Sequence, residues 1–177
     1  SIQFAQIESF PINHTWVAPL MAGEWTLPFS YRIKDESGTL PGGPVTIEAA
    51  PEGQAWIKSF KWNGATYYLT LASPQDLKTG VNTLRAYISK KADDATQPYL
   101  PASEEFTVDI YPTMPDMGNH TSPNNEPLTL QKDGSYQGQL NLTMTGVWDI
   151  HLHVKDAIGN TVAGGEELSE LYWTIAI

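Results

Sequence analysis

The chain has 177 residues, of which 41% are hydrophobic and 17% are charged, so it carries enough apolar side chain for a folded core. Its formal net charge of −10 repels phosphate backbones and anionic headgroups, and we therefore expect no nucleic-acid partner. Cysteine is absent, which excludes disulfides, thiolate metal sites and cysteine nucleophiles. No apolar run reaches the roughly 18 to 20 residues that a membrane-spanning helix needs.

Alternation of apolar and polar residues dominates the chain, and no segment shows a convincing helical period. In residues 25–33 every second side chain is apolar, which predicts one strand with a buried face. The stretch at 90–103 is polar and marked by prolines, so it either links two units or forms a long crossover. Similar alternation recurs at 106–110, 136–144, 148–154 and 171–177. These patterns predict an all-β protein.

Turn signals separate the predicted strands at the spacing of a β-sandwich: SGTLPGGP at 37–44, WNGA at 62–65, KDGS at 132–135 and IGN at 158–160. A weak internal repeat accompanies them. VTIEAAP at 45–51 resembles FTVDIYP at 106–112, and TGVNTLRAYI at 79–88 resembles TGVWDIHLHV at 145–154. We interpret the chain as two β-sandwich units, residues 1–103 and 104–177.

The segment MPDMGNH, residues 114–120, is the clearest candidate for a metal site. Met114, Met117 and His120 lie three residues apart, and Pro115 and Gly118 should bend the loop between them. Copper(I) is a soft ion that favours thioether and imidazole donors, so these side chains suit it where no thiolate exists. The alternative is that the methionines plug the open end of a sandwich, because Met fills irregular gaps well.

Three further candidate ligands lie downstream of this segment, namely Met144, His151 and His153. Met144 shares its parity with apolar residues of the preceding strand, which favours a place in the core over ligation. His151 and His153 stand on the face opposite the core, about 7 Å apart, and can bracket a metal with some bending. Asp149 and Lys155 beside them indicate an ordinary solvated face, which is the alternative for both histidines.

Other function classes find less support. No nucleophile elbow is present and adjacent acidic residues lie in polar connections, so we expect a protein that is not an enzyme. A binding module is the second class, because Trp16, Trp56 and Trp62 are candidates for an aromatic platform that contacts glycans or proteins. Trp56, Phe60 and Trp62 share one parity, however, which favours burial.

Three segments resemble the YtkA-like/FixH-like group of small extracytoplasmic β-domains: MPDMGNHTSP at 114–123, DGSYQGQLNLTMTGVW at 133–148 and DIHLHVKDAIGN at 149–160. The resemblance covers roughly residues 104–160. It implies an immunoglobulin-like sandwich, and with the repeat it predicts an all-β fold of tandem immunoglobulin-like β-sandwiches. Several members of this group are associated with copper handling or with the assembly of copper oxidases, so the resemblance implies copper as the bound metal.

FixH-type members carry a membrane helix, which this sequence lacks. We therefore expect an exported bacterial relative in the periplasm or at the cell surface, soluble or lipid-anchored through a segment outside this sequence. Its partners would be a copper ion or a protein of the cell envelope. The predicted metal ligands are Met114, Met117, His120, Met144, His151 and His153. The alternative function is an extracellular adhesion, assembly or glycan-binding module that holds no metal.

Overall fold

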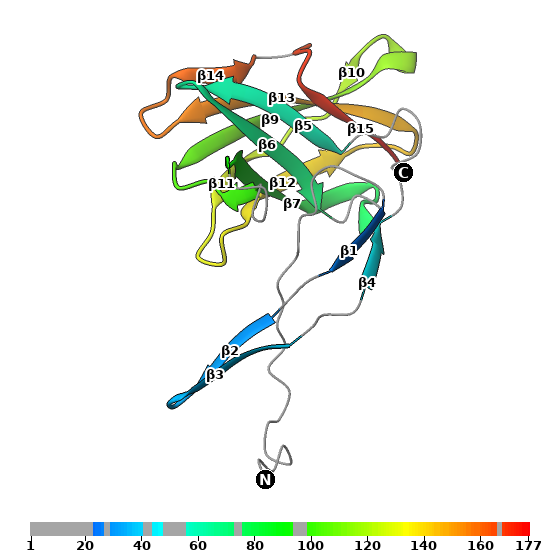
Figure 1. Cartoon of the computed structure of the whole chain (residues 1–177). Helices are drawn as coiled ribbons and strands as arrows, with labels where there is room; N and C mark the ends of the chain where they lie inside the picture. Colours follow the sequence, from blue (N-terminus) through cyan, green and yellow to red (C-terminus); the bar gives the residue numbers. More distant parts are fainter. Residues whose placement is uncertain are drawn as a thin grey trace.

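The computed structural model describes residues 23–26, 29–40, 44–47, 56–72, 76–93, 99–165 and 168–177. Its main body is one 11-stranded sheet that curls into a nearly closed, barrel-like sandwich, so the predicted all-β class is confirmed (Figure 1). The order along the sheet is β14 (Thr161–Gly164), β13 (Val147–Asp156), β9 (Phe106–Met114), β11 (Glu126–Leu130), β12 (Tyr136–Leu142), β7 (Gly80–Lys91), β6 (Ala65–Ala72) and β5 (Ile57–Trp62). Three shorter strands join this path: β10 (His120–Thr121) pairs with β9, β15 (Tyr172–Ala176) with β13, and β8 (Tyr99–Pro101) with β7.

The central strands are β13 and β7. On one side β13 lies between β9 and the pair β14 and β15, and on the other β7 lies between β6 and β12. The strand β11 pairs with both β9 and β12 and so joins the two sides. The ends of the path approach each other, because β5 lies close to β14 and β15.

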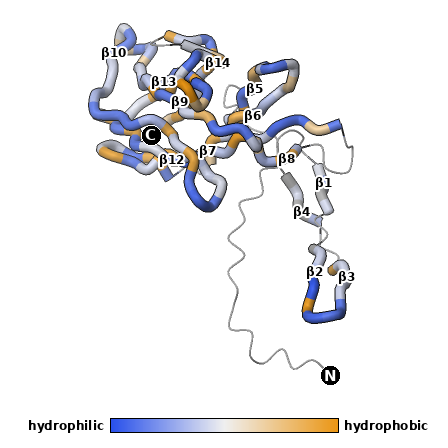
Figure 2. Tube along the Cα trace, turned by 90° about the vertical axis from the view of Figure 1, so that its left-hand side faces the viewer, coloured by the Kyte–Doolittle hydropathy of each residue, from blue (hydrophilic) through white to orange (hydrophobic). Residues whose placement is uncertain are grey.

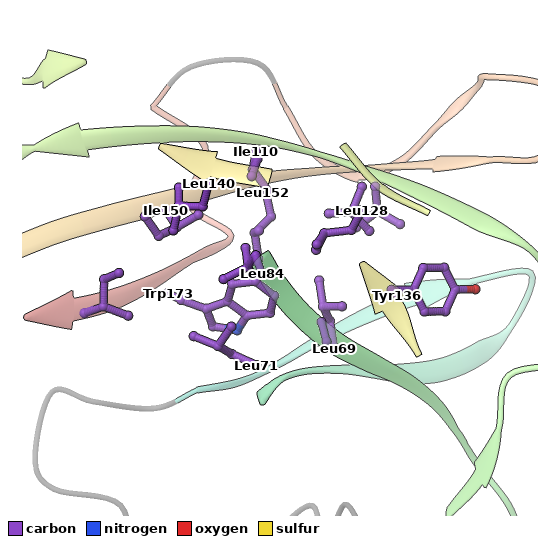
Figure 3. Packing of buried hydrophobic residues seen from close by; sticks show 14 of the residues in the cluster. Leu69, Leu71, Leu84, Ile110, Leu128, Tyr136, Leu140, Ile150, Leu152 and Trp173 are labelled. Atoms are coloured by element: carbon purple, nitrogen blue, oxygen red, sulfur yellow. The ribbon is translucent and has the colours of Figure 1, made fainter. Parts of the chain in front are cut away.

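The core fills the space between these strands (Figure 3). The alternation in β13 shows why: Trp148, Ile150, Leu152 and Val154 are all fully buried, as their common parity predicts. Figure 2 shows the same alternation of hydrophobic and hydrophilic residues along the strands. Residues from β6, β7, β9, β11, β12, β13 and β15 contribute to this single cluster.

An aromatic group closes one end of the core. The Trp62 ring lies 5.4 Å from the Phe106 ring in an edge-on contact, and Phe60 stacks on Tyr67 at 5.3 Å. Trp56 and Trp62 are half-buried and pack against the core. The burial that their parity predicts is therefore confirmed, whereas Trp16 lies outside the described residues.

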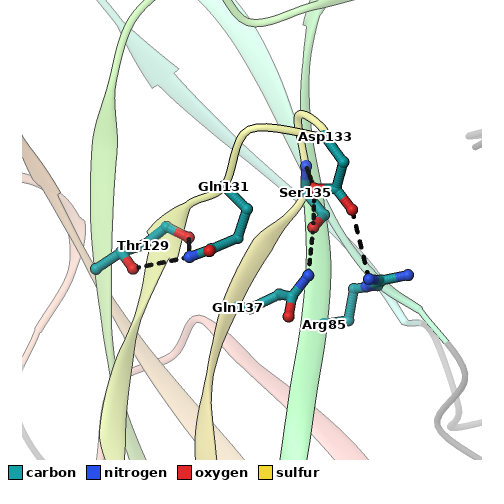
Figure 4. Close-up of polar contacts among 6 residues, drawn as sticks. All are labelled: Arg85, Thr129, Gln131, Asp133, Ser135 and Gln137. Carbon is teal, nitrogen blue, oxygen red and sulfur yellow. Dashed lines mark hydrogen bonds and ion pairs between the residues drawn. The ribbon is translucent and has the colours of Figure 1, made fainter.

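The KDGS segment forms the predicted turn, between β11 and β12 (Figure 4). An Asp133 carboxylate oxygen accepts hydrogen bonds from the Ser135 backbone N–H at 3.0 Å and from its hydroxyl at 2.6 Å. Gly134 takes a φ of +81°, which glycine adopts without strain. Arg85 of β7 reaches the same carboxylate at 3.4 Å, so the turn is also tied to the neighbouring strand.

The predicted division into two immunoglobulin-like sandwiches at residues 103 and 104 does not match this architecture. Seven residue pairs join β7 to β12 across that boundary, from Gly80 with Leu142 to Ala86 with Tyr136. Both sides of the boundary share one hydrophobic core. The strands of the 11-stranded sheet thus form one sandwich, because backbone pairing and apolar burial both cross the proposed seam.

The strand predicted at 25–33 is divided between two elements. β1 (Gly23–Thr26) pairs with β4 (Pro44–Ile47), and β2 (Phe29–Ile33) pairs with β3 (Glu36–Leu40), as two ribbons outside the 11-stranded sheet. Tyr31 and Ile33 are 40% and 46% exposed, so the face predicted to be buried is open here. Among the described residues, no helix has the length and hydrophobicity needed to span a membrane.

One half of the weak repeat has a structural counterpart. The two similar TGV segments lead into β7 and β13, the central strands of the two sides, through Gly80 and Gly146, whose φ angles are +95° and +137°. The other pair is not equivalent, because 44–47 lie in a two-stranded ribbon whereas 106–114 lie in the main sheet.

Candidate metal-binding site

The MPDMGNH segment folds as a tight hairpin at the end of β9, so the predicted bend is confirmed. Pro115 opens a single 3-10 turn, η3 (Pro115–Met117), where its missing N–H costs nothing. Gly118 and Asn119 then adopt left-handed conformations with φ of 64° and 61°. The Asn119 N–H donates to the Met114 carbonyl at 3.0 Å, and β10 returns beside β9.

This hairpin places His120 directly opposite Met114 in the strand register. The His120 ring lies 6.4 Å from the ring of Trp148, which begins the buried part of β13. The Met114 side chain reaches the loop before β13, where its Cε lies 2.6 Å from the position that a Cβ on Gly146 would take. In the same loop, the Met144 carbonyl accepts a hydrogen bond from Trp148 Nε1 at 3.1 Å. We call the group formed by Met114, Met117, His120 and Met144 the methionine end.

The four side chains differ in their access to solvent. Met114 is 5% exposed and belongs to the core, as the plugging alternative predicts. Met117 is 57% exposed, Met144 is 36% exposed, and His120 is also exposed. The methionine end therefore has a buried thioether beneath an accessible imidazole and two accessible thioethers. Ligation of a metal by these groups remains a prediction.

The predicted core position of Met144 is wrong. β12 ends at Leu142, and the chain turns before Met144 is reached. The parity that buries Leu140 and Leu142 therefore stops two residues earlier. A strand pattern fixes a face only while the strand continues.

The solvated setting expected for His151 is also wrong, since only 5% of this residue is exposed. Its Nδ1 lies 2.7 Å from the Ser169 carbonyl oxygen, and its Nε2 lies 3.1 Å from the Thr113 hydroxyl. The Tyr172 ring lies 5.3 Å away. The segment before β15 and the strand itself cover the histidine. Because both ring nitrogens are engaged, a metal would have to displace one of these partners.

His153 is 7% exposed and is buried in the same way. Its Nε2 lies 2.8 Å from the Thr161 hydroxyl of β14. Its Nδ1 faces the Asp109 carboxylate at 3.8 Å, beyond hydrogen-bond distance, and that carboxylate also forms an ion pair with Lys155. The imidazole thus belongs to a polar cluster of the outer face.

The structure does not bring these two histidines to the methionine end. His151 pairs with Tyr111 of β9, three positions before Met114 and so about 10 Å along the strand. The two sites also lie on opposite faces, because Met114 shares the inward parity of Ile110, whereas Tyr111 faces outward. Among the described residues, no group of three or more His, Asp or Glu side chains is placed to hold a metal ion.

Several residues of this region were missed by the sequence analysis. Gly146 gives Met114 its room, and Thr113 and Ser169 hold His151. Only Gly146 had a visible signal, namely its place in the TGV repeat. The partners of His151 come from β9 and from the segment before β15, and no local pattern connects them.

Comparison with known protein families places this region in context. A model described as YtkA-like matches residues 63–153, which extends the expected resemblance toward the N-terminus and includes β6 and β7. Neither the curated proteins nor the solved structures contain a match to the chain. The matched segment is more than half of the chain, so the protein belongs to the YtkA-like family.

Proposed function

We propose that this protein is a non-enzymatic, extracytoplasmic copper-binding domain that holds Cu(I) at the methionine end. Met114 and His120 are the principal donors, and Met117 and Met144 are additional thioethers. The observation that carries this proposal is the cross-strand pairing of Met114 with His120 beside Trp148. It sets a buried soft donor next to an exposed one, with further thioethers on the adjoining turns.

The donor set fits the chemistry of Cu(I). Thioether and imidazole ligands are neutral and soft, and Cu(I) accepts them in flexible geometries where harder divalent ions prefer oxygen. A monovalent cation also suits a protein with a net charge of −10, which raises the local concentration of cations. His151 and His153 are not part of this proposed site.

The proposed cellular role is metal handling or oxidase assembly in the cell envelope. Support comes from membership of the YtkA-like family, which is generally extracytoplasmic. An exposed Met117 and Met144 suit transfer of an ion between proteins, because the incoming partner can reach them directly. An adhesion or assembly module without a metal is the alternative that the test below separates.

The test is a Cu(I) titration under anaerobic, reducing conditions against a competing chromogenic chelator. We expect Met114→Leu and His120→Ala each to weaken Cu(I) binding by at least about tenfold, or about 1.4 kcal/mol. Leucine keeps most of the apolar volume of Met114, so the loss reports the thioether rather than the packing. His153→Gln should leave the affinity unchanged.

Leu130→Ala is the matched control, since Leu130 is an exposed apolar residue at the other end of the sheet, beside the KDGS turn. It should bind Cu(I) like the wild type. Equal Cu(I) affinities for the wild type and the Met114→Leu/His120→Ala double variant would show that the methionine end does not bind the ion. Absence of binding in the wild type would favour the metal-free module.

A further inference from the structure

A pocket lies on the outer face of the sandwich, on the side of β9 away from the core. Its floor is the outer face of β9 at Tyr111 and Thr113, and one wall is the segment from Asn119 to Asn125. Leu168 also lines it. The pocket measures about 410 Å³, within the range of about 300–1,000 Å³ that small-molecule sites occupy.

The polar groups that line this pocket are all neutral. They are hydroxyls and carboxamides from Thr113, Asn119, Thr121, Ser122 and Asn125. None of its described lining residues is Asp, Glu, Lys, Arg or His. Such a lining gives no ion-pair partner to an anion, a cation or a zwitterion, and it favours a neutral ligand rich in hydrogen-bonding groups.

The buried His151 of β13, beside the floor, sets the direction of its hydrogen bond with Thr113. A carbonyl oxygen only accepts, so His151 Nδ1 donates its proton to the Ser169 carbonyl. In the neutral ring Nε2 then accepts, and the Thr113 hydroxyl donates to it at 3.1 Å. The Thr113 oxygen is left as an acceptor for a ligand hydroxyl. His151 therefore has a positioning role, which accounts for its burial without a metal.

The wall of the pocket is held in place and has an unused polar group. Asn125 donates to the Ser122 carbonyl at 2.6 Å and accepts from the Asn141 backbone N–H at 2.9 Å, so it ties the segment to β12. The Ser122 hydroxyl is buried and has no hydrogen-bond partner among the described residues. An unpaired buried hydroxyl costs folding free energy, and a bound ligand can relieve that cost.

Apolar surface completes the pocket. Tyr111 and Pro112 contribute a ring and a pyrrolidine from β9, and Leu168 is 58% exposed at the rim. An aromatic ring beside neutral hydrogen-bonding groups matches the two kinds of surface on a pyranose, which has apolar C–H faces and a hydroxyl edge. Acyclic polyols offer the hydroxyls without the flat apolar face.

We propose that this outer pocket binds a neutral pyranose ring, with Tyr111 against its C–H face and with Thr113 and Ser122 on its hydroxyls. The site shares no residue with the methionine end, so the proposal does not rest on copper binding. It gives the protein a second ligand class, a neutral sugar or the sugar residue of a glycan.

The experiment is a heteronuclear NMR titration of the full chain with D-glucose and N-acetyl-D-glucosamine, and with their methyl glycosides. We expect saturable shifts at the backbone amides of Tyr111 and Thr113 and of the non-proline residues of 119–125, with millimolar affinity. Binding of the free sugars alone would indicate a free monosaccharide, and binding of the glycosides as well would indicate the end of a glycan. Glucuronate and acyclic sorbitol should bind at least about tenfold more weakly.

Variants separate the proposed contacts. Tyr111→Ala should weaken binding by about tenfold, whereas Tyr111→Phe should stay close to the wild type because it keeps the ring. Ser122→Ala should cost about three- to tenfold through one lost hydrogen bond. Thr129→Val, on β11 outside the pocket, is the control and should bind normally.

Three results would overturn the proposal. They are the absence of shifts at 111–125 with either sugar, equal binding of sorbitol and glucose, and wild-type affinity in Tyr111→Ala. Thermal unfolding of each variant shows whether the fold is intact. All sugar titrations are measured without copper. A negative sugar titration would therefore not count against the proposed Cu(I) site, and a negative Cu(I) titration would not count against this pocket.

Discussion

Single residues decide how closely the turns of this protein pack. Gly146 precedes β13 with a φ of +137°, a backbone conformation that side chains rarely adopt. A Cβ at this position would also lie 2.6 Å from the Met114 Cε. Gly134 in the KDGS turn has a φ of +81°, but a Cβ there would meet nothing within 4 Å. The two glycines thus separate backbone strain from steric conflict.

Gly146→Ala should lower the free energy of unfolding by about 1 to 2 kcal/mol, mainly through backbone strain, because the flexible end of the Met114 side chain can move away from the new Cβ at small cost. Urea denaturation checks this value. Gly134→Ala is the control, with an expected loss of about 1 kcal/mol from strain alone. If the free energy of unfolding falls equally in the two variants, the close approach of Met114 to Gly146 does not contribute measurably to stability.

At the scale of elements, one glutamate ties β7 to the start of β9. Glu104 precedes β9, and its carboxylate forms an ion pair with Lys90 of β7 at 2.6 Å. The Lys90 ammonium also lies over the buried Tyr67 ring, 5.4 Å from its centre. Next to this pair, the Tyr136 hydroxyl accepts a hydrogen bond from the Phe106 backbone N–H at 3.3 Å. Four strands, β6, β7, β9 and β12, therefore meet around one charge pair.

The hydrogen bond from Lys90 is the main cause that lowers the pKa of Glu104, from 4.5 to about 2. Since the folded pKa lies below the unfolded one, this stabilisation is complete above about pH 4.5 and is lost as the pH falls toward 2. Glu104→Gln should remove on the order of 1 kcal/mol at pH 7 and only a small part of that at pH 2, where about half of the folded carboxyls are still ionised. Urea unfolding at both pH values measures the difference.

Glu105→Gln is the matched control for this pH dependence, since Glu105 is the exposed neighbour. It should unfold with the pH profile of the wild type. A difference between the wild type and Glu104→Gln that is the same at pH 2 and pH 7 would show that the ion pair is not the cause.

The whole molecule depends on pairing between distant parts of the chain. β12 forms a ladder with β7, and residues from both strands enter one core. Two central strands with similar entrance sequences, β7 and β13, thus belong to one sandwich and not to two. Cooperative unfolding of the described sandwich follows from this shared core.

The fragment 104–177 should be largely unfolded when expressed alone, because it loses β6 and β7 and with them Leu69, Leu84 and Ile88 of the core. Circular dichroism and NMR dispersion check this expectation. The fragment 56–177 keeps every strand of the 11-stranded sheet and is the control, which should unfold in one transition. A folded 104–177 fragment would restore the boundary at residue 103.

Much of the local structure could be predicted, and the reasons are local. The alternation around Ile150 and Leu152 identified β13 and its core face, and the KDGS and MPDMGNH segments contained the residues that their turns require. The burial of His151 and His153 could not be predicted, because parity gives the face but not what covers it. The core position of Met144 was predicted wrongly because the alternation of apolar and polar residues does not change where β12 ends.

By itself, the sequence determined the all-β class, the turns at 62–65, 132–135 and 158–160, the inward residues of the main strands and the YtkA-like family, since each depends on residues close together in the chain. The turn predicted at 37–44 was wrong over 37–40, which lie in β3. Only the tertiary structure decided that one sandwich forms across residue 103, that Met114 meets His120 beside Trp148, and that His151 contacts Thr113 beside a pocket. Strand pairing and coverage join segments that are far apart in sequence. The apolar pattern of a single strand does not identify the strands that pair with it or the segments that cover it.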